Sequence, residues 1–237
     1  MKQKLVGILG GMGPFASAEF VNTIYEHNLN LGAEQNKPRL VLCSDPDIPD
    51  RTTMIEAGQN DAVTEKLIGL WQQMQGMGIE VLVVPCITSH YYTNSYPEAM
   101  RNQMVNLVEL TLQEVESSSK RVLLLATNGS YRTELLQHER IVIPSEADQR
   151  RIHDLAYTMK QYGSRPDLMA HTYEQVRELV RRYEVDGWIS GCTEFHLLTR
   201  YVMREDADAS HQILDPLVLV AKRWPQLAAV KEEGVAK

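Results

Sequence analysis

Apolar residues follow one another without alternation in six short runs of the 237-residue chain. The runs cover residues 5–9, 40–43, 81–84, 121–126, 141–143 and 187–190. A strand with one solvent-exposed face alternates apolar and polar side chains, whereas a parallel strand buried on both faces is apolar throughout. The runs therefore predict parallel strands that are covered by helices on both sides.

The segments between these runs carry apolar residues at helical spacing. Residues 64–78, for example, place Leu67, Leu70 and Met74 on one side of a predicted helix, and residues 173–185 show the same pattern. Strands that alternate with helices form right-handed βαβ units. We therefore expect an α/β fold with doubly wound parallel sheets.

The pattern of apolar run, turn and helix occurs twice. Residues 4–14 (KLVGILGGMGP) and 121–136 (RVLLLATNGSYRTELL) each pass through a glycine-containing turn into a predicted helix. This weak repeat predicts two pseudo-symmetric lobes with an active site in the cleft between them. We assign residues 1–103 and 210–237 to the first lobe, because the last apolar segment is expected to pack back on it, and residues 104–209 to the second.

Composition limits the possible functions. Asp and Glu exceed Lys and Arg by seven, and basic residues form only isolated pairs, so no nucleic-acid-binding surface is expected. No apolar run reaches membrane-spanning length, and glycines and Pro14 cut the first run too short for a signal peptide. We therefore expect a soluble, cytoplasmic protein whose three cysteines are free thiols.

Two of these cysteines end apolar runs in different predicted lobes. Cys86 and Cys192 are each followed four residues later by a histidine, His90 and His196. A single cysteine in such a position is most often a buried core residue. Ligands of open α/β sheets bind at the carboxyl ends of strands, however, and two equivalent lobes would place both thiols at one cleft. Beside helix N-termini, they could then act as an acid and a base of matched strength.

A zinc site is an alternative for the same four residues, because cysteine and histidine are common zinc ligands. Structural zinc sites usually pair cysteines that are a few residues apart, whereas Cys86 and Cys192 are far apart in the sequence. We therefore favour a site without metal.

Two loops after predicted strands are suited to contact an anion. Residues 11–16 (GMGPFA) match the loose glycine pattern of dinucleotide-binding turns, but the acidic residue needed about 20 positions further on is missing. A turn whose backbone N–H groups bind a carboxylate or a phosphate is the better interpretation. Residues 44–55 (SDPDIPDRTTMI) form either an ordinary surface loop or a lid that presents Arg51 to a carboxylate.

Seven short motifs carry a resemblance to a known family: GILGGMGP, DPDIPDRT, PCITSH, LLATNGS, PSEADQRR, GCTE and LDP. In this order and spacing the sequence resembles the aspartate/glutamate racemase family, most closely its cofactor-independent aspartate racemase branch. The resemblance extends from Val6 to Pro216. It implies two similar α/β lobes, a homodimer, an amino-acid substrate, and no pyridoxal phosphate or metal.

The resemblance also implies roles for individual residues. Cys86 and Cys192 would be the two catalytic bases, one thiolate removing the α-proton while the opposite thiol protonates the other face. The substrate-binding residues would be Met12, Arg51, Ile87, Thr88, Thr127, Arg150, Thr193 and Glu194. If the alignment shifts by one, Arg151 takes the place of Arg150.

Two of these positions depart from the family pattern. Ile87 replaces the usual asparagine after the cysteine, which removes a polar contact worth about 1 to 3 kcal/mol. Arg150 replaces a usual lysine, which changes the length and geometry of the cation. Both changes leave the two cysteines intact, so the substrate is open among aspartate, glutamate and related amino acids.

Two other functions are compatible with the sequence. One is a dicarboxylate isomerase or decarboxylase of the same superfamily, although such relatives often keep only one of the two cysteines. The other is a carboxylate-binding homologue that no longer turns over, which Ile87 suggests.

Overall fold

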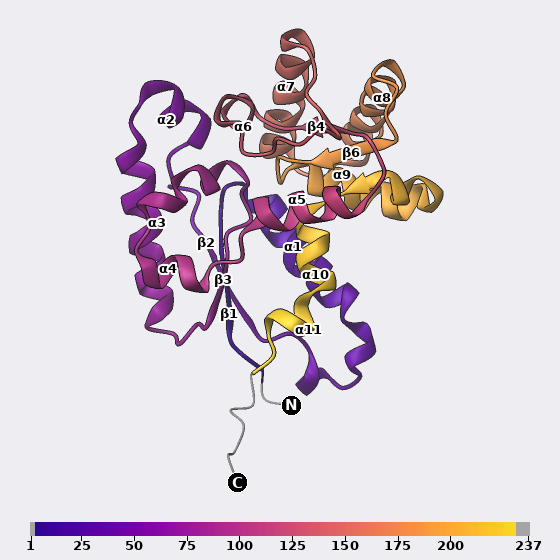
Figure 1. The fold of residues 1–237 in the computed structure, drawn as a ribbon. Helices are drawn as coiled ribbons and strands as arrows, with labels where there is room; N and C mark the ends of the chain where they lie inside the picture. Colours follow the sequence, from indigo (N-terminus) through magenta and orange to yellow (C-terminus); the bar gives the residue numbers. More distant parts are fainter. Residues whose placement is uncertain (1–2, 231–237) are drawn as a thin grey trace.

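The computed structural model describes residues 3–230 and contains two parallel sheets (Figure 1). The first has the order β2-β1-β3, with β1 at Val6–Gly10, β2 at Leu40–Ser44 and β3 at Val81–Val83. The second has the order β5-β4-β6-β7, with strands at Ile141–Val142, Val122–Leu125, Gly187–Ser190 and Ile213–Leu214. All six predicted strands are confirmed, as is the two-lobed α/β fold.

Helices flank both sheets, and several begin where the sequence supplies a capping residue or a proline. Asn106 caps α5 through its side chain, and Pro14 occupies the first turn of α1. The bounds are α1 Pro14–His27, α2 Arg51–Ala57, α3 Asn60–Gln75, α4 Glu98–Gln103, α5 Leu107–Ser117, α6 Asn128–Thr133, α7 Glu146–Tyr162, α8 Pro166–Arg182, α9 Phe195–Glu205, α10 Pro216–Lys222 and α11 Trp224–Leu227.

The two sheets are equivalent in their central strands. β1 lies between β2 and β3 as β4 lies between β5 and β6. Cys86 follows β3 and Cys192 follows β6, so each lobe places one cysteine after the same strand of the repeat. The two turns at the carboxyl ends of these strands are therefore the structural counterparts of one another.

One hydrophobic cluster joins the lobes. It contains Val6 and Ile8 of β1, Val122 and Leu124 of β4, and Trp224 of α11, all of them buried. The C-terminal helices α10 and α11 follow β7, and α10 packs against α1 and α5 (Figure 1). β7, in contrast, pairs with β6 of the second sheet. The lobe boundaries drawn from the sequence stay a prediction, and residues 1–2 and 231–237 lie outside the described chain.

A buried hydrogen-bonded contact also joins the two lobes. The ring of His196, on α9, lies 2.9 Å from the carboxylate of Asp215 through Nδ1 and 2.9 Å from the hydroxyl of Thr23 through Nε2. Asp215 also caps α10, accepting from the N–H groups of Leu217 and Val218. Three helices, α1, α9 and α10, are thereby held to one imidazole.

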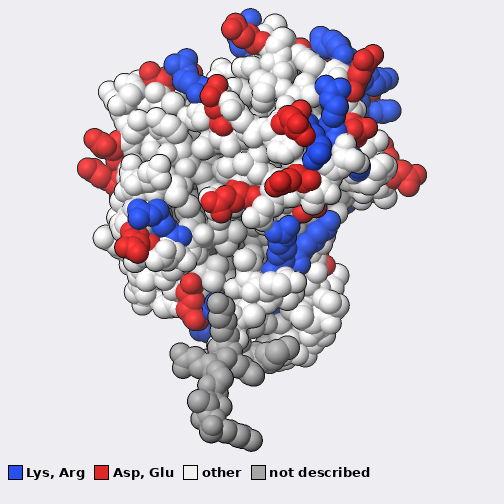
Figure 2. Space-filling model, in the orientation of Figure 1, with Lys and Arg blue, Asp and Glu red and all other residues white. Residues whose placement is uncertain are grey.

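The surface carries charges of both signs. On the face shown in Figure 2, acidic and basic side chains are interspersed. The expectation that the protein does not bind nucleic acid stays a prediction. Within residues 3–230, no helix combines the length and the apolar character that crossing a membrane requires.

Asp215→Ala is expected to lower the free energy of unfolding by about 3–5 kcal/mol, because it leaves His196 buried without its partner and removes the cap of α10. Burial opposes ionisation of Asp215, but His196 and the capping N–H groups lower its pKa below the usual value. Its contribution is therefore complete above about pH 4 and is lost as the pH falls.

Urea unfolding at pH 7 measures this change in the free energy of unfolding. Asp208→Ala is the matched control, because Asp208 is exposed, and it should stay within about 0.5 kcal/mol of the unaltered protein. A loss below about 1 kcal/mol for Asp215→Ala would contradict a stabilising role for the contact.

Candidate active site

A small cavity lies between the lobes at the carboxyl ends of strands from both sheets. Segments that follow β1, β3, β4 and β6 line it, together with the start of α2 and one residue of α7. The lining residues are Met12, Asp50, Arg51, Thr52, Cys86, Ile87, Thr88, Thr127, Lys160, Cys192, Thr193 and Glu194. The free space is about 10 Å³, room for one water molecule. Both cysteines therefore line one narrow site.

Met12 reaches this site because of a tight turn after β1. Gly11 has φ 95°, which a residue with a side chain rarely adopts, and an added Cβ would lie 2.3 Å from the carbonyl oxygen of Asp45. The tight strand-to-helix turn expected from the sequence is thus present. The nearest group to a Cβ added at Gly13 is the carboxylate of Glu194, at 2.7 Å.

The turn that carries Cys86 is held by its own histidine. The carbonyl of Cys86 accepts from Ser89 Oγ at 2.6 Å and lies 3.0 Å from Nδ1 of His90. The other ring nitrogen, Nε2, accepts from the backbone N–H of Leu107 at 3.1 Å. Because Nε2 is an acceptor, the proton of the neutral ring is on Nδ1 and points to the Cys86 carbonyl. His90 therefore orients the turn.

The thiol of Cys192 is bonded to an acidic neighbour. Its Sγ donates to Oε2 of Glu194 at 2.8 Å. Burial and the negative charge of Glu194 raise the pKa of the thiol well above its usual value, and Lys160 offsets only part of this effect. Cys192 consequently keeps its proton at neutral pH.

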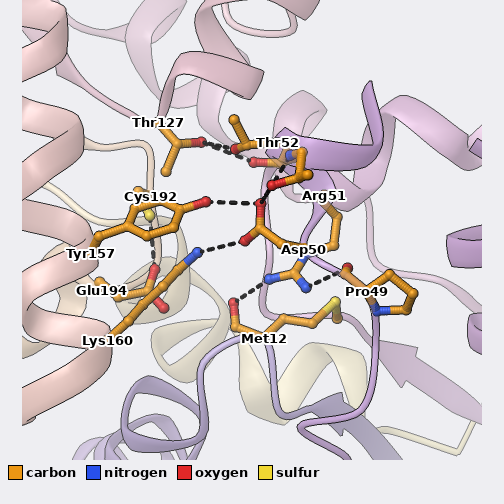
Figure 3. A network of polar contacts seen from close by, with 12 residues as sticks. Met12, Pro49, Asp50, Arg51, Thr52, Thr127, Tyr157, Lys160, Cys192 and Glu194 are labelled. Carbon is orange, nitrogen blue, oxygen red and sulfur yellow. Dashed lines mark hydrogen bonds and ion pairs between the residues drawn. The ribbon is translucent and has the colours of Figure 1, made fainter. Parts of the chain in front are cut away.

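Arg51 places a buried positive charge beside Cys86. It begins α2, and its guanidinium donates to the carbonyls of Met12 at 3.1 Å, Ile48 at 3.2 Å and Pro49 at 2.9 Å (Figure 3). Burial disfavours its charge, but Cys86, Asp50 and Glu194 together raise its pKa. The loop at residues 44–55 is therefore more than a surface loop, since it places a buried cation beside Cys86.

A polar bridge closes the site between the lobes (Figure 3). Asp50 accepts from the hydroxyl of Tyr157 at 2.8 Å and pairs with Lys160 at 3.4 Å. Although burial works in the opposite direction, Lys160, the N–H of Thr53 and Tyr157 lower the pKa of Asp50 to about 2. Burial likewise opposes the Lys160 charge, while Glu194, Cys192, Tyr157 and Asp50 raise its pKa. The bridge is ionised at physiological pH.

Hydroxyl groups from both lobes form one wall. Thr127 lies 3.4 Å from Thr52 and 3.5 Å from Thr88, whose hydroxyl is 2.7 Å from that of Ser130. This approach of α2 to α6 needs Gly129, because a Cβ there would lie 2.8 Å from the Thr52 hydroxyl oxygen. These hydroxyls can both donate and accept, so they can adapt to a bound polar group.

The zinc alternative does not fit the contacts of the two histidines. Both ring nitrogens of His90 and of His196 are within hydrogen-bond distance of protein groups other than thiols. Within the described part of the chain, no three histidine, cysteine or acidic side chains gather as metal ligands.

All the predicted site residues except Arg150 line the cavity. Arg150 is exposed on α7 and lies 3.9 Å from Glu146, while Arg151 bonds to Gln175 and Glu178. Neither arginine reaches the site, because both occupy the part of α7 that faces solvent or α8. Lys160, almost three helical turns later, is the α7 residue that does.

The sequence analysis missed Asp50, Thr52 and Lys160. Asp50 and Thr52 are direct neighbours of Arg51 in a loop already considered as a lid. Lys160 shares a face with His153 and Tyr157, at spacings of four and three residues. That helical spacing of polar residues was the available signal.

The fold and the site define a class of two-lobed α/β proteins in which each lobe contributes a thiol to an interlobe cavity. The family model described as Asp/Glu/Hydantoin racemase matches residues 9–223, and the chain belongs to this family. The predicted enzyme class, an isomerase of the racemase type, is thereby confirmed. Independence from pyridoxal phosphate is in keeping with this family.

Individual relatives are distant but cover nearly the whole chain. The chain is 23% identical over 218 residues to the broad specificity amino-acid racemase RacX of Bacillus subtilis (strain 168), covering 85% of this chain and 90% of RacX. Its fold is similar to that of the Picrophilus torridus aspartate racemase, with a TM-score of 0.74, 23% identity and 97% of both chains covered. The fold is also similar to that of an aspartate racemase homologue from Pyrococcus horikoshii OT3, with a TM-score of 0.69 and 20% identity. This comparison covers 96% of this chain and 99% of that chain.

Glu194→Gln is expected to move the titration of the Cys192 thiol to lower pH, because it removes the negative charge that helps to raise its pKa. The thiolate absorbance of Cys192 against pH measures this, in a Cys43→Ala, Cys86→Ala background. Glu174→Gln, an exposed change on α8, serves as the control. An unchanged or higher midpoint with Glu194→Gln would show that the carboxylate does not protect the thiol.

Proposed function

We propose that the protein interconverts the L and D enantiomers of an amino acid by proton transfer between two cysteines, without a cofactor. The observation that carries this proposal is that Cys86 and Cys192, from equivalent turns of two lobes, line one small cavity. Membership of the racemase family and the likeness to RacX support it. An α-carbon held between the thiols would exchange its proton on opposite faces.

The neighbours of the two sulfurs give them different resting roles. Cys192 is the protonated partner, because it donates to Glu194. Cys86 lies beside the buried guanidinium of Arg51, and the attraction between the two groups raises the pKa of Arg51. We assign Cys192 as the acid and Cys86 as the base in one direction of the reaction, and the reverse reaction exchanges these roles.

Removal of the α-proton places negative charge on the substrate carboxylate, and the site has donors for that charge. Arg51 is positioned to bind a carboxylate. The hydroxyls of Thr88 and Thr127, which line the same cavity, can also donate to this charge. These donors are in position before the reaction begins, so they need little reorganisation during it.

The same site leaves other outcomes to be tested. Dicarboxylate isomerases and decarboxylases of the superfamily often keep only one of the two cysteines, whereas two line this cavity. A carboxylate-binding homologue would hold the ligand without exchange of its α-proton. Assembly as a homodimer and a cytoplasmic location stay predictions from the sequence.

Cys86→Ala and Cys192→Ala are each expected to lower the rate of racemisation by about 10²–10⁴-fold, because each removes one member of the acid–base pair. Single enantiomers of amino acids in D₂O, followed by NMR at the α-proton and by chiral chromatography, provide the measurement. Cys43→Ala is the matched control, because Cys43 lies on β2 outside the cavity lining.

Racemisation that survives either substitution would contradict the two-base mechanism. Ligand binding without exchange of the α-proton, for every amino acid tried, would instead support the carboxylate-binding homologue.

A further inference from the structure

Tyr92 is a buried tyrosine whose hydroxyl has no hydrogen-bond partner within residues 3–230. It lies in the short 3₁₀ helix η3 (Thr88–Ser95), and its side chain is 2% exposed. The two other tyrosines nearby differ: Tyr91 is exposed, and the hydroxyl of Tyr96 donates to the carbonyl of Ser89 at 3.0 Å. Because an unpaired buried polar group is costly, the hydroxyl of Tyr92 indicates an acceptor that is formed during function.

The equivalent position in the second lobe carries no polar group. Tyr92 follows Cys86 by six residues, and Leu198 follows Cys192 by the same number. Leu198 is buried in one hydrophobic cluster with Cys192, just as Tyr92 is buried in one cluster with Cys86. An apolar side chain therefore meets the packing needs of this position, and packing alone does not account for the hydroxyl of Tyr92.

The charges that act on this hydroxyl are those of the candidate active site. The pKa of Tyr92 is raised to about 12, mainly by burial. Arg51 works in the opposite direction, whereas Cys86 and Asp50 add to the increase. Tyr92 consequently keeps its proton at physiological pH and is available as a hydrogen-bond donor.

Arg51 holds a second donor without a partner. Its terminal nitrogens donate to three backbone carbonyls, while Nε, also buried, has no partner in the described part of the chain. Burial opposes the charge of Arg51, and Cys86 comes first among the groups that raise its pKa. Two unpaired donors, one from α2 and one from η3, thus lie near the same cysteine. A thiol is a weak acceptor, but a thiolate carries a full charge and accepts strongly.

We propose that the hydroxyl of Tyr92 donates a hydrogen bond to the sulfur of Cys86 when this cysteine is a thiolate, and that Nε of Arg51 supports the same charge. The proposal rests on the proposed racemase function and adds Tyr92 as a residue that sets the strength of one of its two bases. Hydrogen bonds to the charged sulfur favour the thiolate over the thiol. Leu198 gives Cys192 no corresponding donor.

Tyr92→Phe tests this role, because it removes the hydroxyl and keeps the ring. The titration of Cys86 is followed by ¹³C NMR of its labelled Cβ, in a Cys43→Ala, Cys192→Ala background. Its midpoint is expected to move to higher pH by about one unit, because a hydrogen bond to the charged form is lost. Tyr91→Phe, a change in the exposed neighbour, is the matched control and should leave the midpoint unchanged. An unchanged or lower midpoint in Tyr92→Phe would overturn the proposal.

The matched pair of variants leaves the other titratable groups around Cys86 in place. They are Asp50, Arg51, His90 and Tyr96 from the first lobe, and Lys160 and Glu194 from the second. The difference between the two variants therefore reports the hydroxyl of Tyr92 alone.

Urea unfolding separates this role from a purely structural one. Tyr92→Phe deletes an unpaired buried hydroxyl, so the free energy of unfolding is expected to be unchanged or higher. A lower free energy of unfolding together with an unmoved midpoint would assign Tyr92 a structural role and overturn the proposal.

The kinetics of racemisation give a further readout. In the protein with all three cysteines, Tyr92→Phe is expected to lower kcat at pH 7 about tenfold and to leave KM within about twofold, because Tyr92 acts on Cys86 and not on the substrate. An increase in KM with unchanged kcat would show that the hydroxyl binds the substrate and would overturn the proposal. Absence of racemisation in the unaltered protein would contradict the proposed function instead. The titration needs no turnover, so it would still decide the role of Tyr92.

Discussion

The relative position of the two lobes depends on the buried contact of His196 with Asp215 and Thr23. His196 follows Cys192 by four residues, so the contact that joins α9 to α1 and α10 also fixes the turn that carries the second thiol. In the first lobe, His90 forms the corresponding contacts and links the Cys86 turn to the start of α5. In both lobes the histidine of the Cys-x-x-x-His pattern positions the cysteine turn, and this explains the spacing without a metal.

Equivalent positions in the two lobes acquire different chemistry from their neighbours. Cys86 lies beside the guanidinium of Arg51, whereas Cys192 donates to the carboxylate of Glu194. Arg51 begins α2 after the loop that follows β2, and Glu194 lies in the turn after β6; such connecting segments vary more freely than the strands themselves. The two cysteines therefore face groups of opposite charge, a cation at Cys86 and an anion at Cys192.

Local patterns were enough to predict the strands and the two cysteines, because a continuous apolar run and its polar end are visible within ten residues. The pairing of Lys160 with Asp50 was not predictable in this way, since it joins residues from different lobes. The wrong prediction for Arg150 has a similar cause within one helix. A motif gives the order of residues along α7, but which face of α7 meets the first lobe depends on how the helix packs. The bridge and the cavity follow from the arrangement of the lobes.

The small size of the cavity places a further constraint on the proposed reaction. Because an amino acid is far larger than the single water that fits, the residues that line the cavity have to move before a substrate can bind. The pKa of Asp50 is about 2, so the bridge is present above that pH and is lost only in strong acid. Protonation cannot open it under physiological conditions. Any change in this bridge at physiological pH therefore has to come from motion of the loop or of the lobes, not from a change of protonation.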